Sequence, residues 1–163
     1  MRRWIALLIV AGLLLEATAG AAVRGKSAKY VGGTISSIEL NTKGIFDLKD
    51  SAALFANKKG DPLLTIPYER IESLEYGQKV GRRVGAALGT ALVVSPLFLF
   101  LLFSKKRKHF LTIGFTDEQG KKQGALFELA KGTVGATLST LESKSGKKIE
   151  YETEEARKHA EKQ

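Results

Sequence analysis

The chain has no cysteine among its 163 residues, and its only histidines, His109 and His159, lie far apart in the sequence. The absence of cysteine excludes disulfide bonds, thiol catalysis, thiolate metal sites and a lipid-modified cysteine. Because metal sites with nitrogen or sulfur ligands depend on these two residue types, we expect neither a bound metal ion nor a cofactor.

The sequence also lacks a recognisable catalytic arrangement. Its densest polar run lies within and between two expected strands, 63–68 and 71–76, and contains Tyr68, Glu69, Arg70, Glu72, Glu75 and Tyr76. A catalytic pair of carboxylates needs a fixed separation inside a pocket, and the sequence shows neither. We interpret the run as the solvated side of strands, predict no catalytic residues and expect that the protein is not an enzyme.

Basic residues outnumber acidic residues by 26 to 17, which gives a formal net charge of +9. A charge of this size favours a polyanion or an anionic membrane surface as a partner. Nucleic acid is not expected, because no zinc-finger or aromatic RNA-binding motif accompanies the basic residues. Much of the basic charge instead stands beside the longest apolar run of the chain.

The first 19 residues have the parts of a secretory signal peptide. Arg2 and Arg3 form a basic start, an apolar run of twelve residues follows, and Ala17-Thr18-Ala19 offers a small-residue cleavage site. The alternative is an uncleaved N-terminal anchor, although the run is short for a membrane span. Residues 20–29 form a polar leader. We therefore expect an exported protein of the cell envelope, with the periplasmic face favoured.

Two regions are expected to fold as the halves of one β domain, residues 30–76 and 105–151. Strand-like alternation and β-branched residues mark the segments 30–40, 45–49, 52–56, 63–68, 71–76, 109–116 and 123–129.

The turn Asp117-Glu118-Gln119-Gly120 predicts that the last two of these strands form a hairpin. Val134, Leu138 and Leu141 then recur at helical spacing and predict an amphipathic helix that ends near Ser145-Gly146. Residues 149–151 are a candidate short strand. Residues 152–163 form a charged tail whose oppositely charged pairs favour a helix.

The apolar segment between the two halves, residues 77–104, has the composition of a membrane helix. Its small residues recur every four positions, at Gly77, Gly81, Gly85 and Gly89, a spacing that lets two helices approach closely. An uncharged run of 20 residues follows from Val84 to Phe103, long enough to cross the hydrocarbon core of a bilayer.

Pro96 removes a backbone donor in this run and allows the chain to turn there. Three placements stay open: a helical hairpin or interfacial segment with both ends on one side, a single span, or a helix buried by a partner. The segment is flanked by Arg82 and Arg83 and by Lys105, Lys106, Arg107 and Lys108, which we expect to contact anionic lipid or to flank the membrane.

The order of seven strands and a closing helix resembles the pleckstrin-homology-like domains of bacteria, including GRAM-like members. The stretches that carry the resemblance are LTIPYERIESLEYG (residues 64–77), HFLTIGFTDEQG (109–120) and GALFELA (124–130). The resemblance implies a seven-stranded antiparallel sheet or barrel and a binding role, because such domains mostly bind lipid headgroups, peptides or proteins. Only Lys43 stands where lipid-binding members carry a basic cluster, and the apolar segment is inserted between strands five and six.

These observations lead to one principal expectation: an α+β domain that is attached to the membrane, binds or scaffolds partners without catalysis, and self-associates through its glycine-lined helix. Expected partners are membrane lipid and a second copy or a partner membrane helix. The alternative is a single-span protein with β-rich regions on both faces that acts in transmembrane signalling or envelope structure.

Overall fold

The computed structural model describes residues 25–78, 93–94 and 108–162. The predicted signal peptide, residues 1–19, lies outside this part of the chain, as does most of the segment 77–104. Export and a location in the cell envelope therefore stay predictions.

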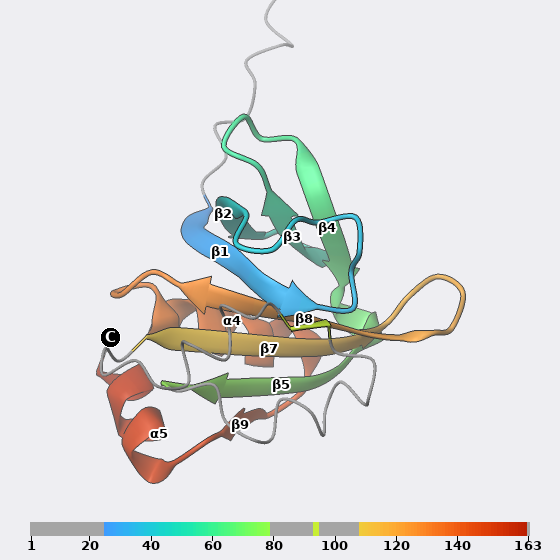
Figure 1. Ribbon diagram of the computed structural model, residues 1–163. Helices are drawn as coiled ribbons and strands as arrows, with labels where there is room; N and C mark the ends of the chain where they lie inside the picture. The colour runs from blue at the N-terminus through green and yellow to red at the C-terminus, as the bar shows by residue number, and fades with distance from the viewer. Residues whose placement is uncertain (1–24, 79–92, 95–107, 163) are drawn as a thin grey trace, which may run out of the picture.

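The described residues form nine strands, two α-helices and one short 3-10 helix (Figure 1). In chain order they are β1 (Lys26–Gly33), β2 (Lys43–Leu48), β3 (Ala52–Ala56), β4 (Pro62–Pro67), η1 (Tyr68–Arg70), β5 (Ile71–Gly77), β6 (Val93–Val94), β7 (His109–Thr116), β8 (Lys122–Leu129), α4 (Val134–Ser145), β9 (Ile149–Tyr151) and α5 (Glu154–Glu161).

The strands make one mixed sheet with the order β4-β3-β2-β1-β8-β7-β5-β9, and β6 pairs with β1 beside this path. Neighbouring strands in this order are antiparallel, except that β9 runs parallel to β5. In Figure 1, β2, β3 and β4 turn away from the plane of β8, β7 and β5, and α4 crosses one face of these three strands.

Strand β1 links the two parts of the sheet. It pairs with β2 through Lys26–Lys29 and with β8 through Ala28–Gly33, with a bulge between Tyr30 and Gly32. A bulge bends a strand and increases its twist, so it allows β1 to pair with both parts of the sheet although their planes differ. Gly33 has φ +149°, and a Cβ atom there would collide with the carbonyl oxygen of Gly124. Only glycine therefore fits this position.

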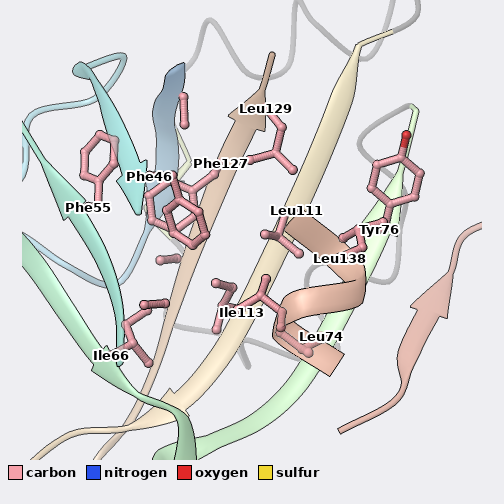
Figure 2. Packing of buried hydrophobic residues seen from close by; sticks show 14 of the residues in the cluster. Phe46, Phe55, Ile66, Leu74, Tyr76, Leu111, Ile113, Phe127, Leu129 and Leu138 are labelled. Carbon is pink, nitrogen blue, oxygen red and sulfur yellow. The ribbon is translucent and has the colours of Figure 1, made fainter. Parts of the chain in front are cut away.

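The core lies between the sheet and α4. Phe127 is at its centre, with its ring centroid 5.0 Å from that of Phe46 and 5.1 Å from that of Phe55. Figure 2 shows these three rings together, with Leu138 of α4 on the side of Leu74. Burying an aromatic or leucine side chain contributes about 1.5–3 kcal/mol, so this cluster is the main source of stability.

Two local predictions are confirmed. The β7–β8 turn is held by Asp117, whose Oδ1 accepts hydrogen bonds from the N–H groups of Gln119 and Lys121, both at 2.9 Å, and Gly120 takes φ +77°. Helix α4 buries Val134, Leu138 and Leu141 and ends at Gly146, which adopts the left-handed conformation with φ 68°.

The predicted fold class is wrong in two respects. We expected a seven-stranded antiparallel sheet and a helix inserted between the fifth and sixth strands. The sheet is instead mixed, because after α4 the chain returns to the open edge of β5 and adds β9 in the parallel direction. Between β5 and β7 the described residues are Gln78, strand β6 and Lys108, and none of them is helical. The expected short strand and helical tail at the end of the chain are confirmed as β9 and α5.

The expected membrane attachment also needs correction. Crossing a bilayer takes about 20 helical residues. The helices of the described ranges have 12 and 8 residues, and none of them is both long and apolar enough to span a membrane. This finding contradicts the expected membrane-attached domain with a glycine-lined transmembrane helix and its single-span alternative.

Candidate binding groove and the tyrosine–histidine cluster behind it

A groove of about 420 Å³ lies between α4, β9 and α5. Its volume falls in the range of small ligand sites. Figure 1 shows β9 and α5 following one another along the β5 edge of the sheet, away from β4. The groove is lined by Gly135, Ala136, Leu138, Ser139, Glu142, Tyr151, Ala160 and Glu161.

The groove exists because both of its helical walls carry small side chains. Helix α4 turns its large apolar residues toward the core, and its other side presents Gly135, Ala136 and Ser139. Helix α5 contributes Ala160, which is buried against the rest of the domain. Short side chains on facing helices leave room for part of a ligand.

Two carboxylates stand in the lining. Glu142 Oε1 accepts a hydrogen bond from the backbone N–H of Ile149 at 3.2 Å. Glu161 Oε1 accepts one from Arg157 Nε at 3.0 Å. Each carboxylate makes these contacts through Oε1, which leaves its Oε2 atom as the position for a further donor.

The pKa of the Tyr151 phenol shows which charged groups lie near the groove. Burial raises the pKa of this phenol, and the negative charges of Glu142 and Glu161 raise it further, while Arg157 lowers it. Both carboxylates are therefore close enough to act on the ring. An aromatic ring with two carboxylates beside it favours a cation over an anion.

Behind the groove, Tyr151 contacts a buried polar cluster. Its ring lies edge-on to Tyr76, with centroids 6.0 Å apart. Tyr76 is 1% exposed, and its hydroxyl lies 2.7 Å from Nδ1 of His109, which is 6% exposed. In Figure 2 the Tyr76 hydroxyl is directed away from the other labelled side chains. The imidazole of His109 in turn meets the edge of His159 in α5, at 5.4 Å between centroids.

The proton positions in this cluster follow from the shifted pKa values. Burial raises the pKa of Tyr76 to about 12, so the phenol keeps its proton. Burial lowers the pKa of His109 below 6.5, with further lowering by His159 and Lys131 and an opposing effect of Glu128. With the phenol protonated and the imidazole neutral, we assign the Tyr76 hydroxyl as the donor to Nδ1, which places the imidazole proton on Nε2.

Of the glycines and proline predicted to pack in a membrane, only Gly77 belongs to the described residues. It is buried at the end of β5, where it pairs with Phe110. The remaining ones, Gly81, Gly85, Gly89 and Pro96, lie outside them.

Of the predicted basic surface residues, the described part of the chain contains Lys108. Its Nζ lies 3.1 Å from Glu128 Oε2, an oxygen that Lys29 also contacts at 2.7 Å. Arg82, Arg83, Lys105, Lys106 and Arg107 lie outside the described ranges. Neither Gly77 nor Lys108 lines the groove.

The residues of the groove and of the cluster were not predicted as a site. Tyr76 and His109 are 33 positions apart, and the two glutamates belong to separate helices. The one available signal was compositional, because both histidines of the chain meet here.

Comparison of the sequence with protein-family models gives no match, and no curated protein is significantly similar to it. The resemblance to pleckstrin-homology-like domains therefore stays a prediction, and the functional argument rests on the groove itself.

Proposed function

We propose that the described domain is a non-enzymatic binding module that holds a cationic side chain, arginine or lysine, of a partner protein in the α4–α5 groove. The observation that carries this proposal is the pairing of Glu142 and Glu161 beside the ring of Tyr151. Charge-assisted hydrogen bonds to a carboxylate are roughly twice as strong as neutral ones, and the aromatic ring adds a cation–π contribution.

The size and composition of the groove favour a side chain over a large ligand. Ala136, which is exposed, and the half-buried ring of Tyr151 offer apolar surface to the methylene groups of lysine or arginine, and the carboxylates stand where the charged end would be placed. The partner is thus a segment that presents an exposed basic residue.

Binding is favoured over catalysis by the types of residue in the lining. The groove contains no histidine, so Ser139 has no imidazole in the lining to activate it. Within the described ranges, no group of three histidine, aspartate or glutamate side chains is placed to hold a metal ion.

The net charge of the described domain is too small to oppose a cationic partner. The described ranges hold 17 of the 26 basic and 16 of the 17 acidic residues, a net charge of +1. The high basicity of the chain thus belongs mostly to the other residues, and the groove is free to be locally acidic.

The test is a titration followed by NMR. The full chain is titrated with the N-acetylated tripeptide amide Ala-Arg-Ala, and with Ala-Gln-Ala as the neutral match. We expect shifts at the backbone amides of Ser139, Glu142 and Tyr151 with the arginine peptide, at roughly millimolar affinity for a single side chain. The glutamine peptide should cause none. Equal shifts with both peptides, or shifts elsewhere only, would contradict the proposal.

The variant Glu142→Gln isolates the charge of one carboxylate, because the amide oxygen still accepts from Ile149. We expect the affinity for the arginine peptide to fall about tenfold, which corresponds to about 1.4 kcal/mol. Glu118→Gln in the β7–β8 turn is the matched control, since Glu118 is exposed and does not line the groove, and it should leave the affinity unchanged.

A further inference from the structure

Helix α5 forms one wall of the groove and depends on its docking contacts to stay folded. It has only 8 residues, far fewer than an isolated helix needs in water. Its first turn is capped by Thr153, whose Oγ1 accepts from the N–H of Ala156 at 3.1 Å. Beyond this cap, α5 buries only the small side chains of Ala156 and Ala160, and the half-buried His159 contacts His109.

One polar contact of α5 is made by His159, whose ring lies nearly perpendicular to that of His109, with centroids 5.4 Å apart. His109 is buried in its neutral form and receives the hydrogen bond of Tyr76 on Nδ1. A proton on Nδ1 would remove this acceptor and place a buried positive charge directly under the helix. A buried charge is costly unless an opposite charge compensates it.

The charged groups around His109 do not supply that compensation. Besides Tyr76 from β5 and His159 from α5, the ring experiences the positive charge of Lys131 after β8 and the negative charge of Glu128 in β8. Glu128 is already held by Lys29 and Lys108 through one oxygen, and Lys108 directly precedes His109 in the chain.

We propose that α5 is a latch released by acid: it stays docked while His109 is neutral and leaves the sheet when His109 takes up a proton. Release removes Ala160 and Glu161 from the groove. One consequence rests on the proposed function: the groove would bind the cationic side chain at neutral pH and release it at acidic pH. The displacement of α5 itself does not depend on any ligand.

The experiment follows α5 by electron paramagnetic resonance of a nitroxide attached to a single cysteine in the full chain. Because the chain has no cysteine of its own, Lys158→Cys labels the exposed side of α5 alone. Ser143→Cys, exposed on α4, is the matched control. We expect the Lys158→Cys label to change from restricted to mobile as the pH falls from 8 to 5, with its midpoint below 6.5, while the Ser143→Cys label stays unchanged.

Two variants assign the change to the proposed proton. His109→Gln keeps an acceptor for Tyr76 but cannot titrate, and it should abolish the change of mobility. His159→Gln removes the facing imidazole and should move the midpoint to higher pH, because a positive neighbour no longer opposes protonation of His109. If His109→Gln fails to fold, the shifted midpoint of His159→Gln still tests the proposal.

Three results would overturn the latch. These are a Lys158→Cys label that is equally restricted at pH 8 and 5, a change that persists in His109→Gln, and simultaneous mobilisation of the Ser143→Cys label, which would mean global unfolding. Since no peptide is present, failure of the groove to bind arginine would not produce any of them.

Discussion

The hydrogen bond from Tyr76 to His109 should be one of the most valuable polar contacts in the domain, and Tyr76→Phe tests this directly. The substitution removes a single oxygen atom. It keeps the ring that stacks on His109 with centroids 6.2 Å apart and meets Tyr151 at 6.0 Å. Core volume and apolar burial are therefore almost unchanged, and the effect reports the hydrogen bond.

The expected cost follows from the burial of both partners. With the hydroxyl gone, Nδ1 of His109 stays buried, 6% exposed as a residue, without its donor. Leaving a buried acceptor unsatisfied costs about 1–3 kcal/mol. A loss of about 2 kcal/mol is a large part of the 5–15 kcal/mol by which small domains are stable. With a urea slope of about 2 kcal/mol/M, the unfolding midpoint should fall by about 1 M.

The assay is urea unfolding at pH 8, where His109 is neutral. The double variant Tyr76→Phe/His109→Leu removes donor and acceptor together, so we expect it to be more stable than Tyr76→Phe alone. A loss below about 0.5 kcal/mol for Tyr76→Phe, or a double variant that is less stable than the single one, would refute the role given to this bond.

Three further predictions concern stability. The pKa of His109 is lowered in the folded state, so the unfolded chain binds the proton more readily. The free energy of unfolding should therefore decrease as the pH falls from about 6.5, and it should level off below the folded-state pKa. In His109→Gln, the free energy of unfolding measured with urea should change less over this pH range. Glu128 has a lowered pKa as well, but its contribution is lost only below 4.5, so measurements above pH 5 separate the two groups. Thr153→Ala removes the N-terminal cap of α5 and should lower the free energy of unfolding by about 1 kcal/mol at most, because α5 is the terminal helix of the described domain. Loss of the cap should appear as faster amide hydrogen exchange in α5 but not in α4. Gly33→Ala should destabilise by more than 2 kcal/mol, through strain at φ +149° and the collision with Gly124, and a thermal unfolding curve like that of the natural chain would contradict the assigned backbone.

The parts of the fold that were predictable from sequence are those that nearby residues determine. The β7–β8 hairpin follows from the alternation of its strands and from Asp117-Gly120, and α4 follows from Val134, Leu138 and Leu141 at helical spacing. In both cases the residues that carry the pattern are also the ones that make the contacts.

The parts that were not predictable depend on distant partners. Lys26–Lys29 show no periodicity and were assigned to a polar leader, yet they belong to β1 because they pair with β2 and β8. Helix α5 was predicted as a charged helical tail. Its docking could not be foreseen, because alanines 156 and 160 give little apolar signal and the other contact is made by His159.

The site escaped prediction for the same reason. The groove needs α4, β9 and α5 to be brought together, and the parallel pairing of the three-residue strand β9 with β5, which does this, has no local sequence signature. The apolar segment 77–104 suggested a membrane role, whereas the groove is lined by residues between Gly135 and Glu161.

A docked α5 completes the groove that we propose for a cationic side chain. The most direct measurement is the dissociation constant of the acetylated Ala-Arg-Ala amide at pH 8 and at pH 5.2, for the natural chain and for His109→Gln. We predict that the natural chain binds more tightly at pH 8 than at pH 5.2, while His109→Gln binds equally at both. Equal affinity at both pH values in the natural chain, or the same loss in His109→Gln, would contradict the account.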